Sequence, residues 1–363
     1  MKVVSGKYSV LAKADLRFNF QFSIKSNMNT LIGLLIIAAG SFGQSSSYVP
    51  IKKVKDWSWE SFWLTQGVFA WLIFPFLGAL LAVPEGSSLG QILSVDASAS
   101  LKAMFFGILW GVGGLTFGLS MRYLGVALGQ SISLGTCSAF GTIIPAIMVG
   151  EDLFHGKGLV LLIGVCIAIA GIAVIGYAGS LRAKNMSEED KKKAIKDFAL
   201  TKGLLVALLA GVMSACFALG LEAGKPLVVD GANELFKTLP ATMMVTFGGF
   251  ITNAIYCLIQ NNKNKTFGDY RKSSLLANNL FFCALAGLLW YSQFFGLGMG
   301  KSFLEPGSVM MAFSWSILMV LNVTFSNIWG IVLKEWKGVS NTTIIVLLIG
   351  LAILICSLIY PNL

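Results

Sequence analysis

The amino-acid sequence predicts an all-α integral membrane protein whose ten transmembrane helices form two inverted five-helix repeats. Composition is the first observation: 56% of the residues are hydrophobic, only 12% are charged, and the mean hydropathy is +0.77. A soluble domain, by contrast, is roughly 25% charged. The second observation is a series of ten long stretches without a charged side chain, and the third is a set of motifs that recur in the second half of the chain. Together they argue against a water-soluble protein.

Each of the ten stretches is long enough to cross a bilayer as a helix. A spanning helix needs about 20 mostly apolar residues, because unpaired backbone polar groups are too costly in hydrocarbon. The first, third, seventh and tenth stretches have more polar ends, and the other six are the clearest. In chain order the predicted spans are Ser26–Ile51, Ser61–Val83, Ala103–Met121, Tyr123–Gly150, Gly158–Leu181, Gly203–Leu221, Thr238–Asn262, Ser273–Gly300, Pro306–Leu333 and Gly338–Leu363.

Three of these spans are longer than the bilayer core. The fourth, eighth and ninth would each be about 42 Å long as straight helices, against a hydrocarbon thickness of about 30 Å. Pro145 and Pro306 allow them to tilt, kink or protrude. Small residues spaced four apart predict close helix packing, or alternatively helices that slide during transport. These residues are Gly107/Gly111, Gly114/Gly118 and Gly125/Gly129, with Gly296, Gly298 and Gly300 nearby in the eighth span.

The chain also repeats itself weakly. Gly107–Trp110 (Gly-Ile-Leu-Trp) recurs as Gly287–Trp290 (Gly-Leu-Leu-Trp), and Leu161–Gly164 recurs as Leu347–Gly350 at a similar offset. Because each repeat would hold an odd number of spans, the second copy inserts upside down, as in secondary transporters. We therefore expect an extension at 1–27, a first repeat at 28–181, a hydrophilic linker at 182–202 and a second repeat at 203–363.

Orientation follows from the lysine and arginine residues. Most of them fall in the loops after the odd-numbered spans, so the positive-inside rule places those loops in the cytoplasm and both chain termini in the periplasm. Residues 1–27 would then have to be translocated despite five basic groups. A translation start at Met28, directly before the first span, resolves this conflict. The basic groups of this extension are Lys2, Lys7, Lys13, Arg17 and Lys25.

Charge and cysteine content exclude several function classes. The net charge of +10 comes largely from loops between spans, which is typical of membrane proteins and is no nucleic-acid footprint. The six cysteines stand singly within apolar spans, so they predict neither disulfides nor a metal site. We expect no cofactor, and the partners would be a small solute, protons and the lipid bilayer.

Uncharged polar and aromatic residues inside the spans are the candidates for solute binding. Polar groups facing lipid are expensive, so these side chains should face the interior. For most of them the simplest role is hydrogen bonding between helices. Tryptophan faces beside amides would also suit a neutral sugar, and the absence of charge in mid-span favours an uncharged solute. The candidates are Trp110, Gln130, Trp290, Tyr291, Gln293, Trp315 and Asn322.

Carboxylates near span ends are the candidates for proton coupling. Glu222, Glu60 and Glu335 could bind a proton if desolvation raised their pKa. For Glu222, a simple ion pair with Lys225 three residues later is the more ordinary role. The sole histidine, His155, lies in a short outer loop and is expected to be solvated. Two further basic residues, Arg122 and Lys334, the latter beside Glu335, would form either gate contacts or weak surface salt bridges.

Four motifs resemble the bacterial L-rhamnose–proton symporter family of the drug/metabolite transporter superfamily. They are Tyr48–Glu60, Gly118–Gly125, Leu289–Phe295 and Leu333–Trp336, in the family's order. The resemblance implies ten spans in two inverted repeats. It also implies uptake of L-rhamnose, a neutral 6-deoxy sugar, with a proton across the bacterial inner membrane by alternating access. The extension at 1–27 departs from the family pattern. The acid at Glu222 is also a departure, because enterobacterial members carry an amide there.

Two rival functions are weighed against symport. A metabolite or drug exporter could share the same fold, since fold does not decide direction or cargo. Many cation exporters would carry a buried carboxylate in mid-span, which this chain lacks. A membrane-embedded enzyme would need convergent acids, histidines or a metal cluster. One histidine and acids placed at span ends indicate that the protein is not an enzyme.

Overall fold

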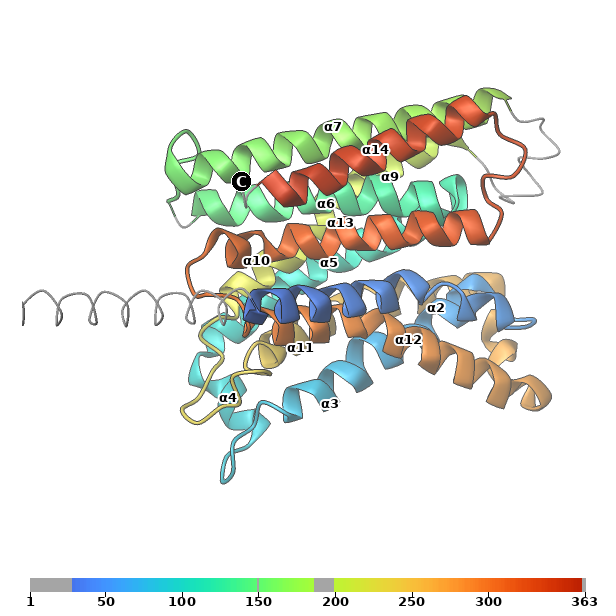
Figure 1. The fold of residues 1–363 in the computed structure, drawn as a ribbon. Coiled ribbons are helices and arrows are strands. Elements are labelled where there is room, and N and C mark those ends of the chain that lie inside the picture. Colours follow the sequence, from blue (N-terminus) through green and yellow to red (C-terminus); the bar gives the residue numbers. More distant parts are fainter. Residues whose placement is uncertain (1–27, 149, 186–198, 361–363) are drawn as a thin grey trace, which may run out of the picture.

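The computed structural model describes residues 28–148, 150–185 and 199–360, and this part of the chain consists of helices joined by loops. Within it, nine helices are long and apolar enough to cross a membrane, and a shorter apolar helix, Asn341–Ser357, follows them. The helices run roughly along one common direction (Figure 1). The predicted class, an all-α protein with multiple membrane spans, is therefore confirmed. The predicted extension at 1–27 lies outside the described residues.

The observed helices follow the predicted spans closely. The first span helix is Met28–Lys53, whose last turn is the 3-10 helix η1 (Pro50–Lys53). The short α4 (Leu89–Val95) and the 3-10 helix η3 (Thr266–Arg271) lie in loops. The other elements are α2 (Trp59–Gly67), η2 (Val68–Ile73), α3 (Phe74–Leu80), α5 (Ala97–Leu124), α6 (Val126–Met148), α7 (Gly156–Asn185), α9 (Leu200–Ser214), α10 (Cys216–Ala223), α11 (Leu239–Asn264), α12 (Ser273–Lys301), α13 (Val309–Val332) and α14 (Asn341–Ile359).

Two spans are interrupted. The second span consists of α2, the π-helical turn η2 and α3 in succession. The sixth consists of α9 and α10, which meet at Ala215. A π-helical turn leaves the ordinary hydrogen-bond ladder locally and is frequent at functional sites. Both interruptions place residues beside the central chamber described below.

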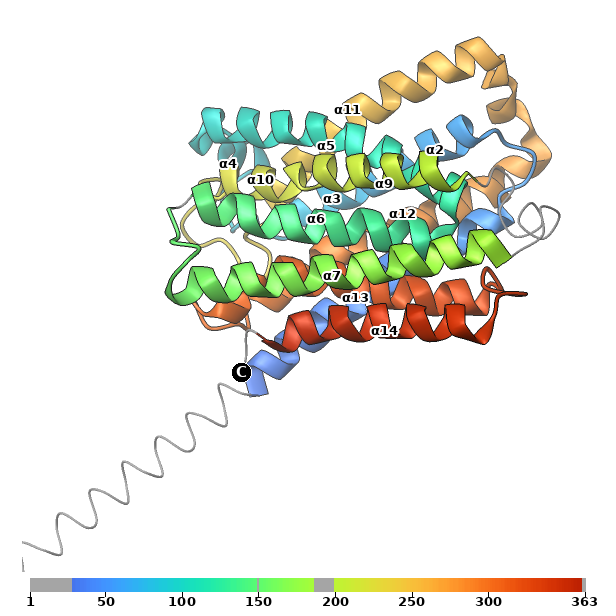
Figure 2. The same cartoon turned by 90° about the horizontal axis from the view of Figure 1, so that it is seen from above.

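Glycines allow the closest helix contacts, as predicted. A Cβ added at Gly107 would lie 2.1 Å from the Val245 carbonyl oxygen, and one at Gly248 would lie 2.1 Å from the Met104 carbonyl oxygen. The α5–α11 pair therefore depends on bare backbone at the crossing point, visible where these helices meet in Figure 2. Gly296 and Gly300 of α12 likewise allow close backbone contact with the first span helix.

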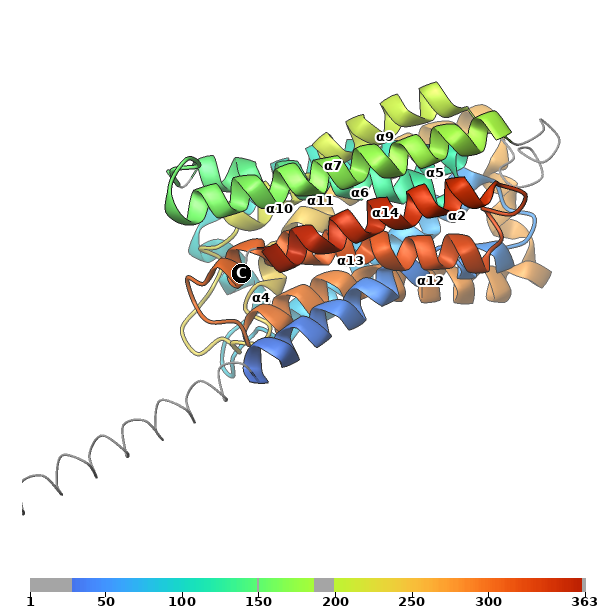
Figure 3. The ribbon, with the colours of Figure 1, turned by 45° about the horizontal axis from the view of Figure 1, so that its top comes forward.

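The outer edge of the bundle is a pair of helices far apart in sequence. The helices α7 and α14 lie side by side (Figure 3) and pack along their lengths. The helix α7 continues to Asn185, beyond the predicted end of the fifth span. Arg182, predicted to lie in the linker, is instead part of α7 and is buried with 1% of its surface exposed. Residues 186–198 of the predicted linker lie outside the described residues, and its end belongs to α9, which begins at Leu200.

Candidate functional site

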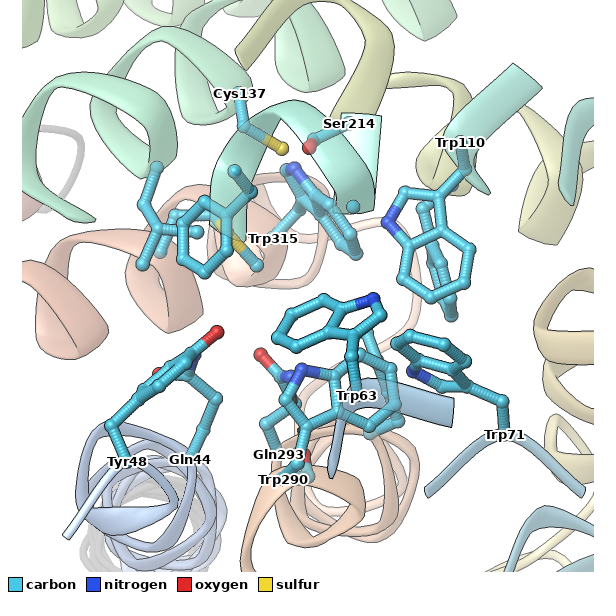
Figure 4. A pocket seen from close by; sticks show the side chains of 16 residues that line it. Gln44, Tyr48, Trp63, Trp71, Trp110, Cys137, Ser214, Trp290, Gln293 and Trp315 are labelled. Carbon is cyan, nitrogen blue, oxygen red and sulfur yellow. Dashed lines mark hydrogen bonds between the residues drawn. The ribbon is translucent and has the colours of Figure 1, made fainter. Parts of the chain in front are cut away.

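A small chamber of about 50 Å³ lies among seven of the spans. Figure 4 shows Gln44, Tyr48 and Gln293 on one side of it, with Cys137 and Ser214 opposite. The residues that line the chamber are Gln44, Tyr48, Trp63, Trp71, Trp110, Gly114, Phe117, Leu134, Cys137, Ser214, Phe217, Trp290, Gln293, Phe294, Trp315 and Met319. None of these lining residues carries a charge at neutral pH.

One wall of the chamber is aromatic. The ring of Trp71 packs edge-on against Trp110 and Trp290, with centroid distances of 5.9 Å and 6.0 Å. Trp110 and Trp290 are themselves 5.7 Å apart. Such edge-to-face packing is favourable for aromatic pairs and fixes the ring positions. The wall therefore presents a rigid apolar surface.

A second wall, next to Trp290 on α12, is built on amides. Gln293 is held by two bonds: its Nε2 donates to the Trp290 carbonyl oxygen at 3.2 Å, and its Oε1 accepts from Asn322 Nδ2 at 3.0 Å. Ser45 donates to the Asn322 carbonyl oxygen at 2.9 Å, which ties the first span helix to α13. The side chain of Gln44 enters the chamber beside this group (Figure 4). The amide wall is consequently a positioned set of donors and acceptors.

Three buried polar atoms of the chamber lining, on Tyr48, Trp71 and Trp315, have no hydrogen-bond partner among the described residues. They are the hydroxyl of Tyr48 and the indole N–H groups of Trp71 and Trp315. Buried polar groups are nearly always hydrogen-bonded. Their position on the lining therefore points to a ligand or to water as the missing partner.

Most of the predicted binding residues meet here. Trp110, Trp290, Gln293 and Trp315 line the chamber, and Asn322 supports Gln293 from behind. Two other predicted residues do not reach it. Gln130 accepts a hydrogen bond from Ser326 between α6 and α13, and the Tyr291 hydroxyl lies against Gly78 of α3.

The first two spans contribute lining residues that were not predicted as binding candidates. Gln44, Tyr48, Trp63 and Trp71 line the chamber. Gln44 and Tyr48 are four residues apart on one helix, so they share a face. That spacing, together with the tryptophans of the second span, was a signal that could have identified them.

A second and larger cavity opens at one end of the bundle. This vestibule has a volume of about 640 Å³, and its lining includes Phe294 and Trp315, which also line the chamber. Glu222 lies on its wall in an ion pair with Lys225, as the spacing predicted, and 27% of the Glu222 side chain is exposed. The charged residues of the vestibule are Glu151, Glu222, Lys225, Glu234, Lys237 and Lys301.

The loop with the sole histidine is exposed to solvent, as expected. His155 Nδ1 lies 2.7 Å from Asp152 Oδ2, and both side chains are more than half exposed. Hydrogen bonds from the Phe154 backbone N–H and from His155 lower the pKa of Asp152 below its usual value. This pair is a surface contact and lines neither cavity.

The opposite end of the bundle is closed by a polar network. Asn264 and Thr266 each donate to Glu60 Oε1 at 2.9 Å, so Glu60 joins the start of α2 to the end of α11. Asp269 Oδ2 accepts from the Ser58 backbone N–H at 2.8 Å. The other partners of the Asp269 carboxylate are the Ser61 hydroxyl and the Lys272 ammonium, each at 2.9 Å.

The ionisation of Asp269 is favoured by this network. Burial raises its pKa, but the hydrogen bonds from Ser58, Lys272 and Ser61 outweigh burial and hold the pKa below its usual value. Asp269 therefore stays charged and ties the loop after α11 to the loop before α2.

A third contact at this end involves buried charges. Glu335 is 6% exposed and interacts electrostatically with Arg182, whose guanidinium lies 5.2 Å from the Trp336 ring centroid. Lys334, the other predicted gate cation, is exposed and has a positive φ of 60°. Arg122 is also exposed.

Comparison with known proteins identifies relatives along nearly the whole chain. Residues 26–360 match the profile of the L-rhamnose-proton symport protein (RhaT) family. An L-rhamnose-proton symporter of Yersinia pestis (strain Pestoides F) is 34% identical over 341 residues, covering 91% of this chain and 96% of the relative. An L-rhamnose-proton symporter of Yersinia pseudotuberculosis (serotype O:1b) matches to the same extent. The resemblance expected from the sequence motifs is therefore confirmed.

Proposed function

The chain belongs to the L-rhamnose-proton symport protein family, and we propose that it imports L-rhamnose, or a closely related neutral deoxy sugar, together with a proton. The proposed setting is the bacterial inner membrane and the mechanism is alternating access. Family membership supports a transporter and not an enzyme. The structural support is the chamber, whose two walls match the two kinds of surface on a deoxy sugar.

The chemistry of the chamber carries this proposal. A 6-deoxy sugar has apolar C–H faces and a methyl group, and hydroxyl groups around the edge of its ring. The Trp71/Trp110/Trp290 wall suits the apolar face, and the amides of Gln44 and Gln293 suit the hydroxyls. The unpartnered Tyr48 hydroxyl and Trp71 N–H would gain hydrogen bonds from the sugar. The uncharged lining supports an electroneutral cargo.

Helix contacts support the proposed inverted repeat. If span one corresponds to span six, span two to span seven and so on, each contact should have a counterpart. The α5–α9 contact corresponds to that of α12 with the first span helix, and the α6–α7 contact corresponds to α13–α14. The pairs α6–α13 and α7–α14 would lie across the pseudo-two-fold axis. We retain residues 28–181 and 203–363 as the two halves.

The proposed orientation places the vestibule outside. The basic loops after the odd-numbered spans would be cytoplasmic, with both termini in the periplasm. Two reporters fused after residue 360 test this orientation. Activity of a reporter that works only in the periplasm supports it. No activity of that reporter, together with fluorescence of a reporter that works only in the cytoplasm, contradicts it.

Glu222 is the proposed proton acceptor in this chain. Of the three candidate acids, Glu222 is the one that lines either of the two cavities described above, and it does so on the side from which the proton would come. Glu60 and Glu335 are both 6% exposed at the opposite end. We propose that these two acids, with Arg182, hold that end closed.

Uptake of radiolabelled L-rhamnose into cells tests the function. We expect saturable uptake that is abolished by an uncoupler and inhibited by unlabelled L-rhamnose. Competition by L-mannose, L-lyxose and L-fucose then ranks the stereochemical requirements of the chamber. Expression that lowers retention of preloaded solutes, with no rhamnose uptake, would instead indicate an exporter.

A further inference from the structure

The chamber and the vestibule are separated by a single layer of aromatic rings. Phe294 and Trp315 line both cavities, so each of these side chains has one face toward the chamber and one toward the vestibule. Phe217 lies between them and also lines the chamber. The three residues come from α10, α12 and α13, which are three different spans.

The rings of this layer are stacked nearly parallel. The Phe217 and Phe294 centroids are 4.1 Å apart with an interplanar angle of 8°, and Phe217 and Trp315 are 5.9 Å apart with an angle of 19°. All three side chains are at most 6% exposed. The layer consists of side chains and not of backbone. Side-chain rotation or a small shift of α10 against α12 would open it.

The two cavities differ greatly in volume. A cavity of about 50 Å³ holds only a few water molecules, which is less space than a pyranose ring needs. The vestibule, at about 640 Å³, is within the size range of small-molecule sites. A sugar from the vestibule side would therefore stop on the Phe294 and Trp315 rings in this conformation.

On the opposite side of the chamber, an aromatic stack is followed by a polar network. Trp63 lines the chamber and stacks on Trp59 at 5.3 Å. Beyond Trp59 lies the Glu60 and Asp269 network, which joins α2 to α11 and η3. The single ring layer thus faces the vestibule, and the Trp59/Trp63 stack with its polar network faces the other end.

We propose that Phe217, Phe294 and Trp315 form the outer gate of the transport pathway, which a sugar must displace to pass from the vestibule into the chamber. The proposal rests on the proposed function for the identity of the cargo. The gate itself is defined by the two cavities and the ring layer between them. Opening it enlarges the chamber and connects it to the vestibule, while the Trp59/Trp63 side stays shut.

Cys137 provides a reporter inside the chamber. It lines the chamber with 2% of its surface exposed, so a membrane-impermeant quaternary-ammonium methanethiosulfonate added outside should react slowly with it. In a chain whose only cysteine is Cys137, we expect Phe294→Ala to speed this reaction about tenfold or more, since it removes a stacked ring that holds the layer closed. Phe217→Ala should act in the same direction.

Phe295→Ala is the matched control. Phe295 is the next residue on α12, but its ring packs on Phe236 at 5.4 Å and lines neither cavity. It should leave the Cys137 reaction rate unchanged. Equal rates in Phe294→Ala, Phe217→Ala and the Phe295→Ala control would overturn the gate.

The labelling assay separates the gate from the cargo. Reaction at Cys137 needs no sugar, so faster labelling in the gate variants supports the gate even in a chain that fails to take up L-rhamnose. Protection of Cys137 by L-rhamnose in Phe294→Ala would further place the sugar in the chamber. If Cys137 reacts fast in the chain with its native Phe217, Phe294 and Trp315, and neither substitution changes that rate, the ring layer is no barrier.

Discussion

Gln293 is the residue on which the polar wall of the chamber depends. Its amide is fixed by the Trp290 carbonyl oxygen and by Asn322, so its remaining hydrogen-bonding capacity is held in one direction. A pre-positioned amide loses little conformational freedom when a sugar hydroxyl binds. The apolar wall gives affinity for the ring face, and Gln293 gives orientation.

We expect Gln293→Ala to reduce L-rhamnose uptake by about tenfold or more, because it removes a buried hydrogen-bonding partner and leaves the Asn322 amide without its acceptor. Gln260→Ala is the matched control, since Gln260 is on α11 and lines neither cavity. Both variants should reach the membrane in equal amounts by immunoblot. Normal uptake by Gln293→Ala would mean that the sugar binds elsewhere.

Asp269 makes the closed end of the bundle sensitive to acid. Its pKa in the folded protein is below the usual value, so its carboxylate stabilises the fold above the pKa of the unfolded chain. This contribution is lost as the pH falls through the folded-state pKa. We expect Asp269→Asn to lower stability by about 1–3 kcal/mol at pH 7, with the difference shrinking below about pH 4.

Thermal unfolding of the detergent-solubilised protein at several pH values measures the effect of Asp269→Asn. Asp230→Asn serves as the control, because Asp230 is exposed in a loop at the other end. If Asp269→Asn differs from the parent protein in stability by the same amount at pH 7 and in acid, the charge of Asp269 is unimportant for stability.

At the scale of the element, close helix contacts decide the packing. The α5–α11 crossing has the Gly107 and Gly248 backbones against the partner helix. In a bilayer the hydrophobic effect does not drive helices together, so van der Waals contact at such crossings matters more. The interrupted second and sixth spans can then adjust locally while the glycine contacts stay fixed.

Gly248→Ala tests this crossing. In an ordinary helix the change from glycine to alanine stabilises by up to about 1 kcal/mol. Here the new Cβ would lie 2.1 Å from the Met104 carbonyl oxygen, so we expect destabilisation of about 1–3 kcal/mol. Gly90→Ala in α4, whose Cβ would have its nearest neighbour at 3.8 Å, should be neutral or stabilising. Unfolding midpoints in detergent compare the two, and a stabilised Gly248→Ala would contradict the packing argument.

At the scale of the whole molecule, the sequence predicted the class and the span positions because charge is costly in hydrocarbon. It predicted only part of the chamber because composition does not say which way a side chain points. Trp290 and Gln293 are three residues apart and share a helix face, whereas Tyr291 is rotated by about 100° from Trp290 and points to α3. Arg182 was assigned to a loop because of its charge, yet Glu335 and Trp336 allow it to be buried.

Coupling of sugar to protons is also a property of the whole transport cycle. If Glu222 binds the proton, Glu222→Gln should still exchange external for internal L-rhamnose but should no longer accumulate it against a gradient. Glu234→Gln is the matched control, because Glu234 lines the same vestibule, forms the same kind of pair with Lys237 and is 75% exposed. Counterflow and uptake assays in vesicles measure the two activities. Gradient-driven accumulation by Glu222→Gln would move the acceptor to another acid.

The most direct measurement is the external pH of a lightly buffered suspension of de-energised cells that express the protein. Symport requires that protons follow the sugar inward, so a pulse of L-rhamnose should make the medium transiently more alkaline, and an uncoupler should abolish the signal. Cells without the protein should give no signal. Uptake of L-rhamnose with no change in external pH, or an acidification, would contradict proton-coupled import.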